Sequence, residues 1–416
     1  MITAVLLGAG NRGMFAYGPY ALNHPNEIQF IGVAEIDPKK RKMFASAHNI
    51  SRDLQFETWE ELLNKPKLAD TLFICTQDDE HFEPALKALE LGYDILLEKP
   101  MSLTPQETLK IAEKAESTGR IVTVAHVLRY ATFFKELKKV IENKEDIGDI
   151  MTIEWTENVG YYHHAHSYVR GNWRKGAEYS SMLLQKSCHD IDLIQWLVEE
   201  DCKQVSSFGR LTYFTEQYAP KEATKRCIDC PLNNDCVYSA LKLYYNDKEE
   251  WPVNVVEPEP DAEKRLKAIT EGPYGICVYK SDNDVVDHQV VNLEFQNGVT
   301  VTFTMSAFTK DIGRTFTIGT TKAEISGSTI DNEITIKYYT GKTVTIHPER
   351  VEGGHGGADT MIMKDFVRQV KGIKESKTTA RNSAMSHLIV FAAEHARKTS
   401  TVVNVNQYIN KFQDHK

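Results

Sequence analysis

Short apolar runs alternate with segments of helical periodicity in the first third of the chain. The apolar runs cover residues 2–7, 28–34, 71–75, 95–97 and 121–125. Helical periodicity follows at residues 83–90 and 105–117, and Thr104 precedes the second segment with Glu107 at the spacing of a capping box. Strands and helices in regular alternation predict repeated βαβ units, and therefore an α/β domain with a doubly wound parallel sheet.

The pattern changes beyond Arg129. A helical segment at residues 133–143 leads to a strand at 150–156, and later strands alternate apolar and polar residues around a hairpin signal at Gly298. These later strands are expected at residues 290–295, 299–305, 315–318, 333–338 and 342–346, with helices near 360–370 and 383–398. They predict a C-terminal α+β domain with a large, mainly antiparallel sheet.

We therefore place two domains along the chain, residues 1–128 and residues 129–416. The second domain contains an irregular insertion near residues 215–283, which is too long for an ordinary connection in a compact domain.

The first apolar run ends in a glycine loop. Gly8, Gly10 and Gly13 have the G-x-G-x-x-G spacing, and Glu35 ends the second apolar run. Between a strand and a helix, this is the fingerprint of a dinucleotide-binding Rossmann fold. The first glycine permits the tight turn, the second lets the backbone approach a pyrophosphate, and the third allows close packing of helix and strand.

Residues around the loop indicate which dinucleotide binds. Asn11 and Arg12 lie within the loop and are expected to contact the cofactor. The carboxylate of Glu35 would accept hydrogen bonds from the ribose 2′-hydroxyl and repel a 2′-phosphate, which favours NAD. Lys39 and Arg41 argue for NADP, because they are cations near the same position. We expect NAD, with NADP as the alternative.

Composition excludes several classes of protein. The chain has 416 residues, more than one hydrophobic core usually serves, and 41% of them are hydrophobic and 26% charged, as in globular proteins. The net charge of -9 disfavours a nucleic-acid partner. No apolar run resembles a signal peptide or a membrane span. We expect a cytoplasmic protein whose seven cysteines are thiols or metal ligands rather than disulfides.

Several motifs make the chain similar to the glucose-fructose oxidoreductase, inositol dehydrogenase and MocA family over nearly its whole length. They are the glycine loop and residues 33–35, 74–76 with His81, 98–100, 166–174, 189–192 and 353–357. The resemblance implies a nicotinamide cofactor contacted by Thr76, His81, Glu98 and Lys99. It also implies oxidation of a hydroxyl, or reduction of the corresponding carbonyl, on a sugar or cyclitol, and a few family members use NAD transiently to hydrolyse glycosides.

Lys99 and His189 are the expected catalytic residues. Hydride removal from a secondary alcohol needs a base for the hydroxyl proton and a donor for the developing charge on oxygen. In the family, the lysine of the Glu-Lys-Pro triplet points at the substrate. A lysine beside a positively charged nicotinamide would also lose its proton more easily.

The sequence departs from the family pattern just before that histidine. Many relatives carry Asp four residues upstream, whereas this chain has Gln185 followed by Lys186. On a continuous helix Gln185, His189 and Asp192 would share a face. We expect Lys186 and Asp190 to contact substrate, the alternatives being a salt bridge for Lys186 and a bond to the backbone or to an arginine for Asp190.

Residues 161–174 are dense in hydrogen-bond donors and aromatic faces. Sugars require both, because their rings stack and their hydroxyls need oriented partners. The candidate substrate-binding residues here are Tyr161, His164, His166, Arg170, Trp173 and Arg174. Substrate binding is favoured over a metal site, and the two arginines would bind an acidic group on the substrate or tie the loop down.

Cys227, Cys230 and Cys236 have a spacing that a tetrahedral ion can collect. Cys277 is the expected fourth ligand, and Cys202 is a less favoured candidate for the same position. A structural zinc is the favoured interpretation, an iron–sulfur cluster is second, and unliganded thiols are third.

Together these features predict an NAD-dependent oxidoreductase that acts on a sugar, a sugar derivative or a cyclitol. A glycosidase that retains NAD is the alternative, because transient oxidation at one carbon would use the same residues. We expect a homodimer or homotetramer formed through the C-terminal sheet.

Overall fold

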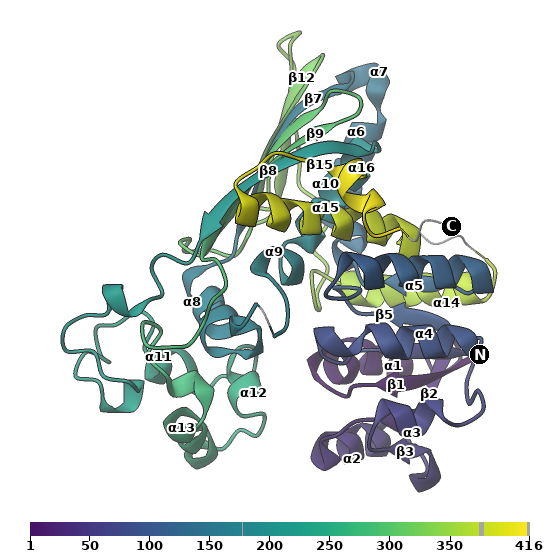
Figure 1. Ribbon diagram of the computed structural model, residues 1–416, viewed down its shortest axis with the longest axis vertical. Helices are drawn as coiled ribbons and strands as arrows, with labels where there is room; N and C mark the ends of the chain where they lie inside the picture. Colours follow the sequence, from purple (N-terminus) through teal and green to yellow (C-terminus); the bar gives the residue numbers. More distant parts are fainter. Residues whose placement is uncertain (177, 374–377, 414–416) are drawn as a thin grey trace.

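The computed structural model describes residues 1–176, 178–373 and 378–413 and contains two β-sheets (Figure 1). The first has six strands, all parallel, in the order β3-β2-β1-β4-β5-β6. They are β1 (Ile2–Leu7), β2 (Ile28–Ala34), β3 (Gln55–Phe56), β4 (Thr71–Ile74), β5 (Asp94–Leu97) and β6 (Val122–Val124). The predicted doubly wound parallel sheet is confirmed.

Helices cover both faces of this sheet, which explains why its strands are almost continuously apolar. Successive residues of a strand face opposite sides, so Val5 and Leu7 pack in one core and Ala4 and Leu6 in the other. The first core includes α3 (Trp59–Leu63), α4 (Phe82–Glu90) and α5 (Pro105–Thr118). The second includes α1 (Gly18–Asn23), α2 (Pro38–Ala47) and α14 (Ala358–Val370). Thr104 caps α5 as predicted, since its side chain accepts the Glu107 N–H.

The second sheet has nine strands in the order β14-β13-β12-β11-β7-β10-β9-β8-β15. They are β7 (Ile150–Asn158), β8 (Cys202–Arg210), β9 (His288–Phe295), β10 (Thr300–Ser306), β11 (Gly313–Thr320), β12 (Ala323–Ser328), β13 (Glu333–Tyr338), β14 (Thr343–Ile346) and β15 (Val403–Asn404). β10 runs parallel to β7 and the other neighbours are antiparallel. The mainly antiparallel sheet is therefore confirmed, as is the hairpin at Gly298, where φ is +86°.

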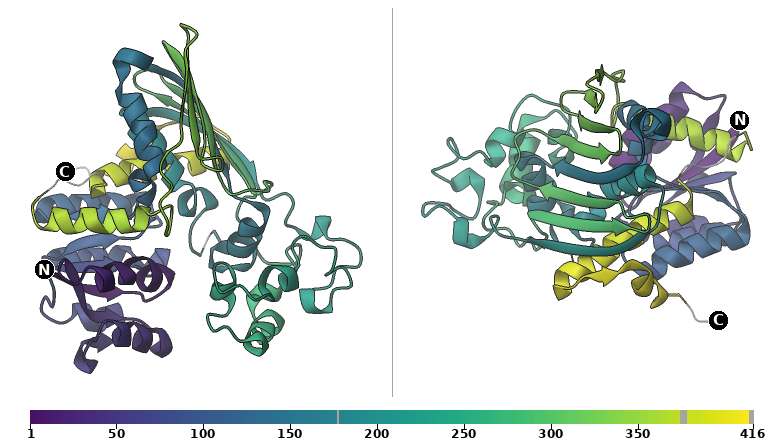
Figure 2. Two further views of the ribbon diagram at one scale, coloured as in Figure 1. Left: turned by 180° about the vertical axis from the view of Figure 1, so that it is seen from behind. Right: turned by 90° about the horizontal axis from the view of Figure 1, so that it is seen from above.

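One face of this sheet is covered by helices and the other is open in the single chain (Figure 2). The covering helices are α6 (Thr132–Glu142), α10 (Cys188–Val198), α15 (Ala380–Thr399) and α16 (Val405–Asn410). Phe208, 66% exposed, lies on the open face, because it alternates in β8 with the buried residues Val205 and Ser207. None of the described helices combines the length and the apolar character needed to cross a bilayer.

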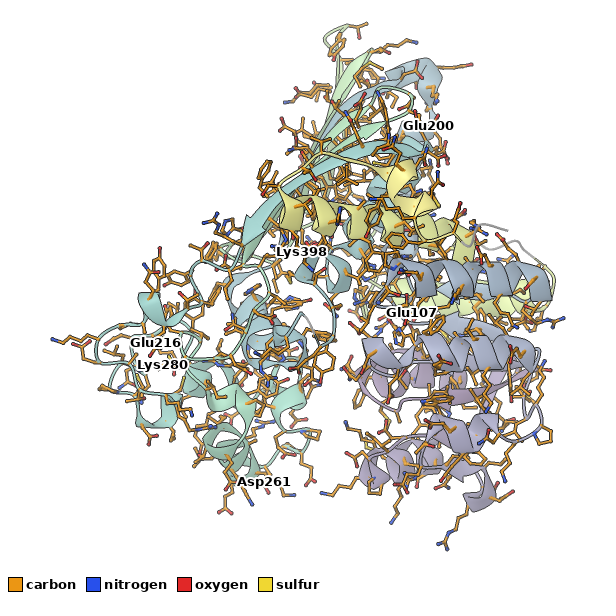
Figure 3. All side chains as sticks on the ribbon, viewed as in Figure 1. Glu107, Glu200, Glu216, Asp261, Lys280 and Lys398 are labelled. Atoms are coloured by element: carbon orange, nitrogen blue, oxygen red, sulfur yellow. The ribbon has the colours of Figure 1, made fainter. Side chains whose placement is uncertain are left out.

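Between β8 and β9 the chain forms an irregular lobe, residues 211–287, beside the first sheet (Figure 1). It contains the short helices α11 (Ala240–Tyr244) and α12 (Val253–Val256) and the longer α13 (Ala262–Glu271). Figure 3 marks Glu216 and Lys280 on its loops and Asp261, whose side chain caps α13. α8 (Tyr161–His164) and η5 (Ala165–Arg170) pack against it. The lobe corresponds to the insertion expected near residues 215–283.

The end of the chain returns to the first sheet, which the sequence pattern did not predict. The Phe366 ring on α14 packs edge-on against Phe73 of β4, with 5.4 Å between ring centroids. On the same helix, Gln369 accepts a hydrogen bond of 2.7 Å from Thr123. Part of the segment assigned to residues 129–416 therefore completes the core of the first sheet.

Phe366→Ala tests this return packing. The ring is fully buried, so we expect its removal to lower the free energy of unfolding by about 3–5 kcal/mol. Met361→Ala on the exposed side of α14, where Met361 is 40% exposed, is the matched control and is expected to change it little. Urea unfolding of both variants measures the difference. Equal midpoints would show that α14 does not stabilise the sheet.

Candidate active site

The glycine loop has the geometry that a dinucleotide requires. Gly8 has φ of +86°, and a Cβ there would lie 2.5 Å from the carbonyl oxygen of Cys75. A Cβ on Gly13 would lie 2.4 Å from the carbonyl oxygen of Gly8, whereas a Cβ on Gly10 would meet no atom within 4 Å. Close packing therefore allows only glycine at positions 8 and 13. Gly10 faces open space that a pyrophosphate can approach.

A cavity of about 460 Å³ adjoins this loop and is lined by Gly10, Glu35, Trp59 and Thr76 among others. The Glu35 carboxylate is fixed at its edge, because it accepts the Ala9 N–H at 2.7 Å and the Asp37 N–H at 2.9 Å. The guanidinium of Arg41 donates to the backbone carbonyl of Glu35. The loop and the cavity thus fit the cofactor that the sequence predicts.

Arg12 is held by contacts within the protein, and its expected role as a cofactor ligand stays a prediction. Its Nε donates to Glu98 at 2.6 Å, and its two terminal nitrogens donate to Asp359 at 2.8 and 3.0 Å. Tyr17 also donates to Glu98. Burial alone would raise the pKa of Glu98, but Arg12 and Lys99 outweigh it and lower that pKa. Arg12 shapes the loop through these contacts, while Asn11 remains exposed beside it.

His81 is buried behind the cofactor loop. Its Nδ1 lies 2.6 Å from the carbonyl oxygen of Pro100 and its Nε2 lies 3.3 Å from that of Thr76. The ring therefore joins the two turns that follow β4 and β5. His81 positions these turns, and the hydroxyl of Thr76 is bonded to the Glu80 carbonyl at 2.9 Å.

Lys99 extends from the end of β5 toward the second sheet. Its Nζ donates to the backbone carbonyl of Gln185 at 2.8 Å. Gln185 ends the short helix α9 (Met182–Gln185), and His189 lies in α10, which begins at Cys188. The expected shared face of Gln185, His189 and Asp192 is therefore wrong, because the helix breaks at Lys186 and Ser187. The break frees the Gln185 carbonyl to accept from Lys99.

His189 is held as a neutral imidazole. It is 7% exposed, and its pKa is lowered well below 6.5 by burial and by the nearby charge of Lys99. His126 and His355 lie beside it, with ring centroids 5.8 and 6.4 Å away. Among the described residues its Nδ1 has no hydrogen-bond partner. The neutral ring has one unprotonated nitrogen that can act as an acceptor, and burial disfavours its protonated form.

Lys186 joins a buried charge cluster that the sequence only partly indicated. Its Nζ lies 3.4 Å from Glu157, and Arg314 lies 2.5 Å from the other oxygen of that carboxylate. Burial lowers the pKa of Lys186, and Glu157 opposes that shift. Asp190 accepts from Trp155 at 2.9 Å and from Arg314 at 3.0 Å and is fully buried, so its expected contact with substrate is not supported.

Glu157 and Arg314 are the residues of this cluster that the sequence analysis missed. Glu157 shares the inward face of β7 with Ile153 and Trp155 by the two-residue period of a strand. A charged residue at an inward position was the available signal. Arg314 carries the same signal in β11, where it shares a face with the buried residues Phe316 and Ile318, and it lies opposite Glu157 in the sheet.

Most of the candidate residues in the segment 161–174 pack inside the lobe. His164 stacks on Phe214 at 5.2 Å, and burial lowers its pKa to about 4. His166 stacks on Tyr274 at 4.8 Å, and burial lowers its pKa to about 3. Arg170 donates to the backbone carbonyls of Ile276 and Tyr238. These three residues form the lobe's interior, which corrects their predicted contact with substrate.

The remaining candidates of this segment lie nearer the surface. Arg174 pairs with Asp282 at 2.7 Å, which supports the alternative that it ties the loop down. Tyr161 and Trp173 are half-buried, and Trp173 lies 6.2 Å from the Tyr168 ring. They stay predictions for substrate contact.

The four candidate metal ligands, Cys227, Cys230, Cys236 and Cys277, line one cavity. Within the described part of the chain, however, no three His, Cys, Asp or Glu side chains are grouped closely enough to hold a metal ion. The predicted structural zinc therefore has no support. Cys202 lies elsewhere, in β8, where its thiol contacts the carbonyls of Gln204 and Glu294.

Two family models match the chain. Residues 2–126 match the NAD-binding Rossmann fold of an oxidoreductase family, and residues 138–405 match the C-terminal α/β domain of the same family. The chain belongs to the Gfo/Idh/MocA family of oxidoreductases. The resemblance stated from its motifs is confirmed, and the protein is an oxidoreductase with an NAD-binding domain.

Similar proteins include dehydrogenases. The oxidoreductase YteT of Bacillus subtilis (strain 168) is 25% identical over 388 residues, 88% of each chain. The scyllo-inositol 2-dehydrogenase (NAD(+)) of the same organism is 28% identical over 228 residues, 52% of this chain and 60% of that protein. The structure of levoglucosan dehydrogenase with NADH and L-sorbose matches with a TM-score of 0.71 at 17% identity, over 97% of this chain and 98% of the other. This last likeness shows the shared fold.

A buried histidine supports the turn after Lys99 and makes stability depend on pH. His387 accepts the Met101 N–H on Nε2 at 3.0 Å and faces the Ser383 carbonyl with Nδ1 at 2.6 Å. Burial, with a contribution from His126, lowers the pKa of His387 to about 3. Only the neutral ring can accept from Met101, so the folded state resists a second proton.

Because the folded pKa is lowered, His387 contributes stability that is fully present above the unfolded pKa of about 6.5 and is lost as pH falls toward 3. The slope contributed by one such group is about 1.4 kcal/mol per pH unit. We expect His387→Gln to flatten the decline in unfolding free energy between pH 6 and about 3. Exposed His347→Gln is the control and should keep the wild-type slope, as measured by urea unfolding at each pH. An unchanged slope in His387→Gln would contradict the assignment.

Proposed function

We propose that this protein transfers a hydride between NAD and a hydroxyl or carbonyl of a sugar, a sugar derivative or a cyclitol. The observation that carries the proposal is the bond between Lys99 Nζ and the Gln185 carbonyl. It brings the lysine at the carboxyl end of β5 to the turn that carries Lys186 and leads to His189. Doubly wound folds bind their ligands at this edge of the sheet.

The chain supplies proton handling and positioning. NAD, when bound, supplies the hydride acceptor. Lys99 has an ammonium that can donate a hydrogen bond to the substrate oxygen and steady its developing charge. The neutral imidazole of His189 can take the hydroxyl proton, and its burial excludes water from competing for it. Together the two residues remove the hydroxyl proton and stabilise the oxygen while the hydride is transferred.

Lys186 is proposed to hold the substrate beside this pair. Its side chain is 17% exposed, and its ammonium pairs with the fully buried Glu157, which orients it. Arg314 fixes Glu157 in turn. Of the predicted aromatic contacts, half-buried Tyr161 and Trp173 remain available for a sugar ring. The two similar dehydrogenases, which are named for scyllo-inositol and levoglucosan, support a polyhydroxylated ring as the substrate.

The proposal is tested with a panel of sugars, cyclitols and glycosides. The purified protein is incubated with NAD, and nicotinamide absorbance and free sugar release are followed together. Reduction of NAD in proportion to substrate supports the dehydrogenase. Sugar release with no net change in nicotinamide would identify the alternative, a glycosidase that retains NAD. Activity on none of the three classes would overturn the proposal.

Lys99→Ala and His189→Ala test the catalytic assignment. Loss of a general acid-base group typically lowers kcat by about 10²- to 10⁴-fold. NAD affinity should stay close to wild type, because the cofactor loop is not altered. Lys67→Ala, which removes a lysine bonded to the Gly92 carbonyl at the opposite edge of the sheet, is the matched control and should keep activity. Wild-type turnover by folded, NAD-binding Lys99→Ala and His189→Ala would show the assignment to be wrong.

Preference for NAD over NADP is proposed from Glu35 at the edge of the cofactor cavity. We expect Glu35→Gln to shift the ratio of affinities toward NADP by about tenfold, or about 1.4 kcal/mol, because repulsion of the 2′-phosphate is removed. Glu57→Gln, which neutralises another carboxylate of the same cavity, is the control. Calorimetric titration with both dinucleotides measures the ratio. Tighter binding of NADP by the wild type would contradict the proposal.

The open face of the nine-stranded sheet is proposed as the surface of a homodimer or homotetramer. Its exposed apolar residues, such as Phe208, favour burial against a second copy. We also propose a cytoplasmic location, where a dinucleotide-dependent dehydrogenase meets its cofactor.

A further inference from the structure

Four cysteines from two distant segments line one cavity of about 330 Å³ in the lobe. Cys227, Cys230 and Cys236 come from one loop and Cys277 from a segment some forty residues later. The backbone holds these segments together, since the Cys277 N–H donates to the Lys225 carbonyl at 3.0 Å and residues 226 and 276 form an antiparallel bridge. The convergence of the four thiols is thus built into the fold.

A buried positive charge lies against this cavity. Arg170 also lines it, is 1% exposed, and places one terminal nitrogen 3.4 Å from the Cys227 sulfur. Its other terminal nitrogen has no hydrogen-bond partner among the described residues. A guanidinium buried in this way needs negative charge nearby. Neutral thiols provide none, whereas metal-bound thiolates do.

The arrangement of the thiols disfavours one small ion. Zinc binds each thiolate at about 2.3 Å, which draws four sulfurs around a single point. No three ligating side chains in the described residues are grouped in that way. An iron–sulfur cluster differs, because each cysteine binds a separate iron and the cluster occupies the space between the sulfurs. The four thiols line a cavity of about 330 Å³, which leaves room for a cluster between them.

We propose that Cys227, Cys230, Cys236 and Cys277 bind an iron–sulfur cluster and that Arg170 is its adjacent counter-charge. Each thiol loses its proton when its sulfur binds iron, and iron and inorganic sulfide are supplied from outside the chain. The cluster links two segments of a lobe that otherwise has small apolar cores, one around Tyr238 and one around Tyr244. Its role is to stabilise the lobe, and it stands independently of the proposed hydride transfer.

Metal analysis of the intact protein tests the proposal. The full chain is purified without oxygen or chelators, and iron, zinc and acid-labile sulfide are measured per chain. We expect iron and sulfide in equal amounts, with the broad visible absorption of a cluster. Zinc without sulfide, four freely alkylated thiols without metal, or disulfides between these cysteines in mass spectra would each overturn it.

Cys230→Ser and Cys236→Ser test the ligands, and Cys202→Ser is the matched control. The first two remove half-buried thiols of the cavity, and the control removes a buried thiol outside it. We expect loss of iron and visible absorption in the first two and wild-type content in the control. If the ligand variants do not fold, iron is withdrawn from the wild type with a chelator. The thermal midpoint should then fall and recover with iron and sulfide, and an unchanged midpoint would contradict the role.

Arg170→Gln tests the counter-charge. We expect iron to leave this variant several-fold faster under a chelator, because the thiolates lose their neighbouring cation. Arg174→Gln is the control, since Arg174 pairs with Asp282 and does not line the cavity. Equal rates of iron loss in the two variants would remove Arg170 from the proposal.

Discussion

The partly buried ion cluster around Arg12 is the interaction on which the rest of the structure depends. It joins the glycine loop to Glu98 at the end of β5 and to Asp359 at the start of α14, 347 residues away in sequence. A buried guanidinium costs several kcal/mol unless its hydrogen bonds are made, and here each nitrogen has a carboxylate partner. Loss of one carboxylate would leave part of the guanidinium without its hydrogen-bond partner, so the three segments hold one arrangement.

This constraint also bears on the proposed site, to which both halves of the structure contribute. Glu98 precedes Lys99, so the cluster that shapes the cofactor loop also fixes the backbone of the lysine. A second buried cluster, Glu157 with Arg314 and Asp190, holds Lys186 from the nine-stranded sheet. The bond from Lys99 to the Gln185 carbonyl connects the two sides. In the proposed site, paired charges on both sides therefore fix the separation between the cofactor edge and the turn that carries Lys186.

Short sequence patterns predicted those features of the fold that depend only on neighbouring residues in the chain. The glycine loop, the parallel strands, the cap at Thr104 and the hairpin at Gly298 each follow from a few adjacent residues. The return of α14 to the first sheet did not, because the contacts of Asp359 and Phe366 are made with residues hundreds of positions away. The break between α9 and α10 was missed for a similar reason: apolar residues on both sides continue a helical pattern, and tertiary contacts decide where it stops.

The lobe contributes to this geometry through aromatic contacts. Trp251 packs on His163 with 4.7 Å between ring centroids, and His163 lies 6.2 Å from Tyr168. Tyr168 donates to the side chain of Gln185, whose backbone carbonyl accepts from Lys99. Each contact restricts the next, so the position of the lysine depends on a lobe with little apolar core of its own. A segment of this kind needs a cross-link to keep its shape, which gives a physical reason for four cysteines to converge there.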